Sequence, residues 1–277
     1  MRPALHTPPF APPRAGPLCH AADVRLNEIE PVTADAARPV RRVLLSQSWL
    51  DLAFLHWAVD PGTVAPLLPR GVRPDVIDGR TYIGLIAFRM HRIGWLGLPG
   101  LPWLGSFPET NVRLYSVDEL GRRGVVFLSL DASRLLPVLT ARIGFRLPYI
   151  WSRMSVQRTG PETETPTDTV FNYTSRRHWP SRHDIQSRIS IRIGEPISEP
   201  SPAEHFMTAR WGLHYAPLGR ALYLPNEHPR WALHRAELLD LHENLIAAAG
   251  LPSPSGPPDS VLYSPGVPVR FGPPAPR

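Results

Sequence analysis

The sequence predicts a mainly β fold of the α+β class, in which an antiparallel barrel or strongly curved sheet carries a few peripheral helices. Short segments rich in aromatic and β-branched residues outnumber the helical patterns, and the connections between them are short. The chain has 277 residues, of which 43% are hydrophobic, and is long enough to bury a full-sized core. Antiparallel strands with short connections typically close into a barrel, which removes their exposed edges.

The first expected elements are two strands on either side of a short helix. Residues Trp49–Val59 are rich in aromatic and apolar side chains and end at Asp60-Pro61-Gly62, a turn signal. A short helix is expected over Val64–Leu68. The segment Thr81–Met90 is mostly apolar throughout, which is typical of a strand that is buried on both faces.

The middle of the chain predicts two hairpins with a strand between them. Asn111–Val117 and Gly124–Ser129 are joined by a polar turn, and Val170–Arg176 and Gln186–Gly194 are joined by a polar segment. Phe145–Ser155 is expected to form the strand between the two hairpins.

Three further helices and two closing strands complete the prediction. Asp131–Arg142 is a helical candidate, and Pro202–Gly212 follows Ser201, a residue suited to cap a helix. A helix over Leu233–Ala249 is expected to end at Gly250, because glycine favours the position after a helix. The last expected strands are Ser260–Tyr263 and Val267–Phe271.

Proline is concentrated near the ends of the chain. We predict that residues 1–38 form a disordered proline-rich tail and that residues 39–272 form a single domain. A segment rich in proline and alanine, with little apolar periodicity, cannot build helices or sheet ladders and does not offset the entropy lost on ordering.

Composition excludes several classes of function. The single cysteine, Cys19, allows no disulfide within the chain, which indicates a reducing compartment. No apolar run of about 18 residues is present, so no membrane partner is expected. We therefore expect a cytoplasmic protein. A homo-oligomer is compatible with the sequence but not indicated by it.

The charged and metal-binding residue types point to no macromolecule or cofactor. The net charge of +6 is modest, and the arginines are interspersed with acidic residues. Nucleic acid is therefore not an expected partner, and binding of nucleic acid through the arginines is the weakest alternative that stays open. The histidines lack the spacing of metal ligands, and glycine-rich phosphate-binding motifs are absent, so neither a metal nor a cofactor is expected.

The chain contains no lysine, because all 30 of its basic residues are arginine. A Schiff base with a carbonyl substrate requires an amine that can lose its proton. Lysine supplies such an amine when its pKa is lowered, whereas arginine stays protonated. Catalysis through an imine on an internal side chain is therefore excluded.

A polar stripe follows the segment Phe107–Tyr115. Alternate residues of a strand share a face, so Glu109, Asn111, Arg113 and Tyr115 are expected on one side. The acid is suited to act as a general base, the guanidinium to hold a carboxylate, and the phenol to donate a proton. The alternative is an ordinary amphipathic strand whose polar face is exposed to solvent.

A second cluster lies in Ala141–Tyr149. Arg142 and Arg146 flank Gly144, and Tyr149 follows a proline that fixes the backbone before it. The aromatic ring of Tyr149 would then have a reproducible direction. A core tyrosine near the start of a strand is the alternative.

Several motifs in the same order resemble the YqjF-like family, domain of unknown function 2071, over about residues 43–272. The motifs are Trp49–Trp57, Leu67–Val72, Phe107–Arg113, Gly124–Asp131, Ala141–Tyr149, Ala209–Tyr215, Glu227–Pro229 and Val261–Val267. That family is similar to the acetoacetate-decarboxylase-like superfamily. The resemblance implies an antiparallel β cone or barrel around a small, largely apolar cavity.

The superfamily resemblance also suggests which residues form the site. Glu109 matches the cavity glutamate of the decarboxylase, Arg142 matches a cavity arginine, and Tyr149 stands where the Schiff-base lysine would follow Pro148. A second decarboxylase arginine is matched by Ala58. We expect Glu109 and Arg142 to form an ion pair inside the barrel.

Two hypotheses about function follow. In the first, the protein acts on a small organic acid or carbonyl compound by lyase- or hydratase-like chemistry without a lysine. Glu109 and Tyr149 would then be catalytic. The substrate-binding candidates are Arg113, Arg142, His56, Asn111 and Tyr115. In the second, the protein is a non-catalytic sensor or carrier of an apolar small molecule. Fold analogy alone does not separate the two.

Overall fold

The computed structural model describes residues 28–95, 105–134, 147–160, 167–179, 184–219 and 221–276. Most of these residues belong to one sheet. Its strands are β1 (Leu45–Val59), β2 (Val72–Pro74), β3 (Thr81–Trp95), β4 (Phe107–Asp118), β5 (Arg123–Ala132), β6 (Tyr149–Thr159), β7 (Val170–Trp179), β8 (Gln186–Pro196), β9 (Gly212–Tyr215), β10 (Leu222–Glu227), β11 (His234–Glu243), β12 (Ser260–Phe271) and β13 (Ala275–Pro276). The helices are α1 (Pro61–Val64), α3 (Pro202–Thr208) and α4 (Leu245–Ala248), with 3-10 turns at Ala65–Leu67 and Pro217–Gly219.

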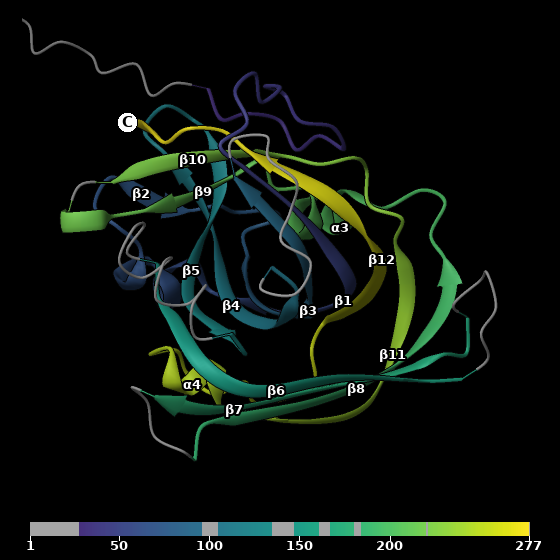
Figure 1. The fold of residues 1–277 in the computed structure, drawn as a ribbon. Coiled ribbons are helices and arrows are strands. Elements are labelled where there is room, and N and C mark those ends of the chain that lie inside the picture. Colours follow the sequence, from purple (N-terminus) through teal and green to yellow (C-terminus); the bar gives the residue numbers. More distant parts are fainter. Residues whose placement is uncertain are drawn as a thin grey trace, which may run out of the picture.

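The sheet closes on itself. Neighbouring strands pair in the order β5-β6-β7-β8-β11-β12-β1-β3-β4, and a pairing of β4 with β5 completes the ring. A shorter path from β5 through β9 and β10 to β12 closes a second, smaller ring. The two rings share strands β12, β1, β3, β4 and β5. In Figure 1, β1, β3 and β4 run between β9 and β10 above and β6, β7 and β8 below. The prediction of a mainly antiparallel barrel with peripheral helices is confirmed.

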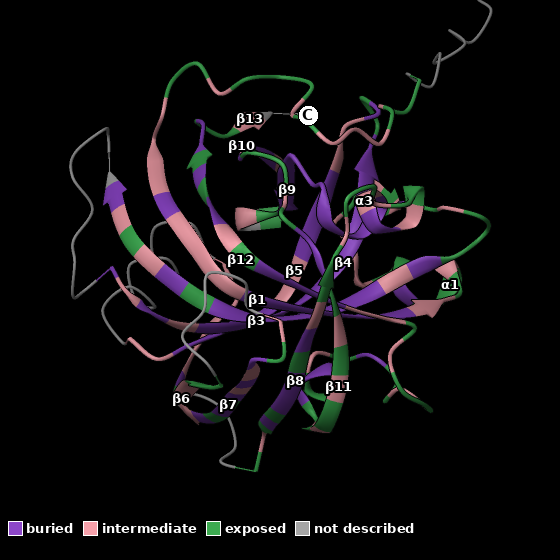
Figure 2. Ribbon diagram, turned by 90° about the vertical axis from the view of Figure 1, so that its right-hand side faces the viewer, coloured by how far each residue is buried: buried purple, intermediate pink, exposed green. Residues whose placement is uncertain are grey.

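Among the shared strands, β1, β3 and β4 lie between two packed interiors. Residues on both faces of these three strands are therefore buried. On one face, Leu55, Leu85 and Val112 pack against β7 and β8 through Phe171 and Ile191. The opposite face of the same strands points into the smaller ring, where β9 and β10 lie. Figure 2 shows buried positions along most of β3 and β4 and in the later part of β1, whereas exposed positions recur along β8 and β11. The strand expected to be buried on both faces therefore lies in β3.

The helix predicted over Leu233–Ala249 is wrong for most of its length. Residues His234–Glu243 form strand β11, which pairs with β8 and β12, and only Leu245–Ala248 are helical. The segment contains good helix formers, but hydrogen bonds to two neighbouring strands outweigh that local preference. A register shift between Leu238 and Asp240 interrupts the alternation of side chains between the two faces. The sequence pattern therefore does not indicate a strand here.

The other helix predictions had mixed outcomes. Helix α3 begins where expected, and Ser201 caps it by accepting a hydrogen bond from the backbone of Glu204. Asp131 and Ala132 belong to β5, so the helix predicted from Asp131 does not begin there. Its later part lies outside the residues that the structure describes.

Residues 28–38, the last part of the predicted tail, contact the barrel. The backbone of Glu30 bonds to Gly121, the carbonyl of Thr33 accepts a bond from Trp211, and Asp35 pairs with Arg230. This segment therefore differs from the disordered tail that proline content predicted, because it finds partners that the tail's own composition does not reveal. In Figure 1 the purple chain before β1 lies near β10.

These contacts predict different effects on the melting temperature for two truncations of the chain. Removing residues 1–27 should leave the melting temperature nearly unchanged, because their composition is rich in proline and lacks apolar periodicity. Removing residues 1–38 should lower it by about 5 °C, because several hydrogen bonds and the packing of Val32 are lost. Differential scanning calorimetry of both truncated proteins measures the difference. Equal melting temperatures would show that residues 28–38 add no stability.

Candidate functional site

A cavity of about 230 Å³ lies inside the smaller ring, between the shared strands and β9 and β10. Most of its wall is apolar. The tryptophan and phenylalanine rings that line it are Trp49, Phe54, Phe88, Phe107, Phe127, Trp231 and Phe271. Polar side chains interrupt the apolar wall, namely Gln47, Glu109, Asn111, Arg113, Tyr149, Thr208, Arg210, Asn226 and His228. An apolar enclosure with a small number of convergent polar groups is typical of a ligand site.

The structure brings most of the predicted site residues to this cavity. Glu109, Asn111, Arg113 and Tyr149 line it directly. His56 and Tyr115 lie behind Arg113, where both are buried and bonded to each other. Arg142 lies outside the described residues, as does its predicted ion pair with Glu109.

Glu109 is nearly inaccessible to solvent, with 3% of its surface exposed. Tyr149 donates a hydrogen bond of 3.1 Å to its carboxyl group. Burial raises the pKa of Glu109 to about 8, although hydrogen bonds from Tyr149 and Asn111 oppose that shift. The carboxyl group is therefore mainly protonated at pH 7 and close to its own pKa at pH 8.

Arg113 is held by neutral partners. Its Nη2 donates to the carbonyl of Met207 at 2.9 Å, and its Nε donates to the hydroxyl of Tyr115 at 3.1 Å. Gly84 on β3 leaves room for it, since a Cβ atom there would lie 3.1 Å from Cγ of Arg113. Among the described residues, no carboxylate lies within ion-pair distance of this guanidinium. The cavity wall thus carries a buried cation without a counter-charge.

His56 and Tyr115 fix the position of Arg113. The hydroxyl of Tyr115 donates to the carbonyl of Met207 at 2.8 Å and lies 2.6 Å from Nε2 of His56. Because that hydroxyl has a single proton, Nε2 of His56 is the donor of the shorter bond. Burial holds the pKa of His56 well below its usual range, and the charges of Arg113 and Arg210 add to that effect.

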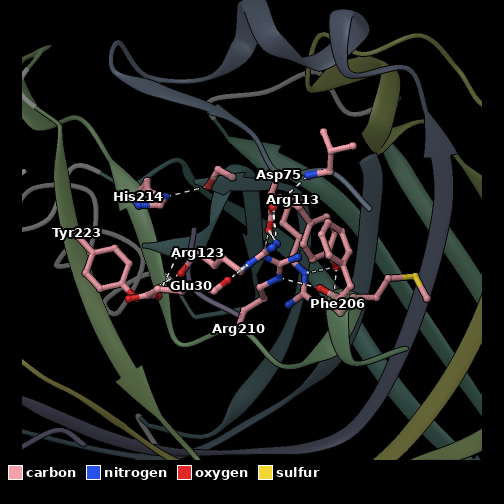
Figure 3. A network of polar contacts seen from close by, with 12 residues as sticks. Glu30, Asp75, Arg113, Arg123, Phe206, Arg210, His214 and Tyr223 are labelled. Carbon is pink, nitrogen blue, oxygen red and sulfur yellow. Dashed lines mark hydrogen bonds and ion pairs between the residues drawn. The ribbon is translucent and has the colours of Figure 1, made fainter. Parts of the chain in front are cut away.

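Arg210 is a second cation at the cavity, and it is compensated. Its Nη1 pairs with Asp75, which also pairs with Arg123, and its Nε donates to the carbonyl of Phe206 at 2.7 Å. Its guanidinium lies 4.2 Å from the ring centre of Phe206. Figure 3 shows Asp75 between the two arginines. Sequence reasoning missed Arg210 as a site residue, although it lies in the Ala209–Tyr215 motif.

His228 was also missed, although its motif Glu227–Pro229 was noted. Its ring lies between Trp211 and Trp231, at 4.5 and 4.7 Å between ring centres. Nδ1 lies 2.7 Å from the carbonyl of Pro229. A carbonyl only accepts hydrogen bonds, so Nδ1 carries the proton and Nε2 is the acceptor. Burial lowers the pKa of His228 to about 4, and the nearby charge of Arg113 contributes.

A buried Ser-His-Asp cluster lies outside the cavity. Ser116 bonds to Nδ1 of His214 at 2.8 Å, and Nε2 of His214 lies 3.4 Å from Asp118. None of the three side chains lines the cavity, and all are buried. Asp118 is engaged further by Arg122 and by two backbone amides. The cluster thus ties β4 to β9 and leaves the serine no open site for attack.

The described residues lack two further features. They contain no group of three or more His, Cys, Asp or Glu side chains placed to hold a metal ion. No helix formed by these residues is long and apolar enough to cross a membrane.

The barrel has the fold of acetoacetate-decarboxylase-like proteins. An acetoacetate decarboxylase-like enzyme from Sphingomonas wittichii RW1 superimposes with a TM-score of 0.57 at 12% identity, over 89% of this chain and 94% of that chain. For acetoacetate decarboxylase from Legionella pneumophila the values are 0.52 and 13%, over 89% and 95%. For the enduracididine biosynthesis enzyme MppR with bound HEPES they are 0.55 and 13%, over 85% and 88%. At these identities the similarity shows the fold alone.

Sequence comparison then places the chain more closely. Residues 46–268 match the domain of unknown function 2071, described as an uncharacterized conserved protein, and the chain belongs to this family. It is 30% identical to the uncharacterized protein YqjF of Bacillus subtilis (strain 168) over 220 residues, which are 78% of this chain and 85% of that protein. The family predicted from the motifs is confirmed, and the fold is the one that the superfamily resemblance implied.

Proposed function

We propose that this protein binds a small organic acid or carbonyl compound in the barrel cavity and acts on it by proton transfer without a Schiff base. The observation that carries the proposal is Arg113, a buried guanidinium on an apolar wall with no carboxylate partner among the described residues. A buried charge of this kind is costly unless it is paired. A carboxylate ligand would supply the missing partner and bind in a bidentate manner.

The charges around Arg113 favour an anion. Arg210 lies on the same cavity, and the only carboxylate close to it, among the described residues, is Asp75, which is shared with Arg123. Glu109 is mainly uncharged at pH 7 because its pKa is raised to about 8. A carboxylate in the cavity therefore meets two cations without repulsion from Glu109.

Glu109 and Tyr149 supply the proposed chemistry. A carboxyl group with a pKa near the working pH is suited both to donate and to take up a proton. Tyr149 holds this carboxyl group by its hydrogen bond. Since the chain has no lysine, the reaction class is a proton transfer at or next to a carbonyl group, as in lyases and hydratases. The related MppR has been solved in complex with pyruvate, a small keto acid.

The alternative is a non-catalytic carrier or sensor of an apolar small molecule. The observation that favours it is the wall of the cavity, which is formed mostly by aromatic and aliphatic side chains. In that case Glu109 stays protonated and bonded to Tyr149, and Arg113 serves only to hold neighbouring carbonyls.

The test compares an acid with its neutral ester. Pyruvate should bind to the wild-type protein at least tenfold more tightly than methyl pyruvate, as measured by isothermal titration calorimetry, because only the acid pairs with Arg113. Arg113→Gln should abolish this difference, whereas Arg192→Gln, on the exposed face of β8, should preserve it. Equal affinity of acid and ester in the wild-type protein would overturn the role of Arg113.

A second measurement separates catalysis from binding. The wild-type protein should accelerate exchange of the methyl protons of pyruvate in D₂O, followed by NMR, and Glu109→Gln should remove the acceleration. Binding of pyruvate without any acceleration in the wild-type protein would refute proton transfer and favour the carrier or sensor.

A further inference from the structure

We propose that the ligand is a hydroxylated carboxylic acid with a ring-sized apolar body, whose hydroxyl group donates a hydrogen bond to Nε2 of His228. This inference rests on the proposed function, since it assumes that the carboxylate of the ligand lies on Arg113. It adds a second polar contact and the chemical class of the ligand body.

The geometry of His228 makes it an acceptor for a ligand. Its Nδ1 is committed to the carbonyl of Pro229 at 2.7 Å, which leaves Nε2 unprotonated in the neutral ring. The aromatic contacts with Trp211 and Trp231 fix the plane of the imidazole. The ring lines the cavity, and no described residue forms a hydrogen bond with Nε2, so a ligand donor is its fitting partner.

The protonation state supports the same role. Burial and the charge of Arg113 keep the pKa of His228 at about 4, so the ring is neutral and accepts a hydrogen bond at pH 7. The other charged or titratable groups on the cavity wall are Arg113, Arg210, Glu109 and Tyr149. The two cations disfavour an ammonium group at this position, so a hydroxyl is the fitting donor.

A second acceptor lies two residues earlier in the chain. Asn226 on β10 lines the cavity, and its Oδ1 is buried without a hydrogen-bond partner among the described residues. An unpartnered buried acceptor costs about 1–3 kcal/mol. Oδ1 of Asn226 thus lacks a donor among the described residues, which again indicates a ligand that donates.

The size and walls of the cavity define the apolar body. An apolar cavity of about 150 Å³ is large enough for benzene. The volume here is about 230 Å³, which leaves space for a ring together with a carboxylate-bearing carbon. Aromatic rings from β1 and β3 and from the segment after β10 surround that space, namely Trp49, Phe88 and Trp231. Such walls favour an aryl group or a ring of similar size.

The test uses two acids that differ by one hydroxyl group. Mandelate should bind to the wild-type protein about tenfold more tightly than phenylacetate, measured by calorimetry at pH 7. His228→Phe keeps an aromatic ring between the two tryptophans but removes the acceptor, so it should bring the ratio close to one. His242→Phe, on β11 and away from the cavity, should leave the ratio unchanged.

A measurement on the wild-type protein does not depend on the folding of the variant. With ¹⁵N-labelled histidine, mandelate should shift the Nε2 resonance of His228, and phenylacetate should shift it much less. Equal affinity of the two acids, equal shifts, or a ratio that persists in His228→Phe would each overturn the inference. Failure of both acids to bind would also overturn it, while the comparison of pyruvate with its ester would still decide the proposed function.

Discussion

Replacing Asp75 with asparagine should lower the free energy of unfolding by about 3–5 kcal/mol, the largest loss expected for any single polar substitution considered for this protein. Asp75 has 1% of its surface exposed and pairs with Arg123 and Arg210. Arg210 is itself buried, so the substitution strands a guanidinium in the interior that has no other carboxylate partner among the described residues. Removing one partner of a buried pair costs more than the pair contributes, because the remaining charge keeps its desolvation penalty.

Urea unfolding at pH 7, followed by circular dichroism, measures this loss. Asp35→Asn is the matched control, because Asp35 also pairs with an arginine, Arg230, but both side chains are exposed. The control should lose little stability, because solvent screens an exposed ion pair. A loss of similar size in both variants would show that the network around Asp75 is hydrated in solution.

Replacing Glu109 with glutamine should change how stability depends on pH. The pKa of Glu109 is about 8 in the folded protein and 4.5 for the free group. Below pH 4.5 the carboxyl group is protonated in both states, and glutamine is a close substitute. Between pH 4.5 and 8 the unfolded chain releases this proton and the folded protein retains it, so the wild-type protein loses stability as pH rises. The variant lacks this loss and should be more stable at pH 8 by a few kcal/mol.

Chemical denaturation at pH 5, 7 and 8.5 measures the trend. Glu237→Gln, on the exposed side of β11, is the control and should follow the wild-type curve. Parallel curves for wild type and Glu109→Gln would mean that Glu109 is ionised and paired in solution. That outcome would favour the ion pair with Arg142 that the superfamily resemblance suggested.

The period of the strand around Glu109 was enough to predict one part of the site. Side chains alternate along a strand, so Glu109, Asn111 and Arg113 had to share a face whatever the strand packed against. The same period did not show that the hydroxyl of Tyr115 turns toward Met207 behind Arg113. That contact depends on Met207 in the last turn of α3, 92 residues later in the chain.

The local sequence pattern predicted the wrong secondary structure where the composition suits both a helix and a strand. The segment that forms β11 contains leucine, alanine and glutamate, which suit a helix, and its alternation is broken by a register shift. Arg210 and His228 carried no periodic signal at all. They reach the cavity because β9 and β10 close the smaller ring and bring their flanking residues onto its wall.

The sequence by itself determined what chemistry this protein lacks and to which family it belongs. Absence of lysine excludes an internal imine, because this conclusion depends on the side chains present and not on where they lie. Tertiary structure alone decided the charge states of the site. Burial raises the pKa of Glu109 to about 8, and the partners of Arg113 among the described residues are carbonyl and hydroxyl groups. Burial and distance between segments far apart in the chain set both properties, and neither is encoded in any single stretch of residues.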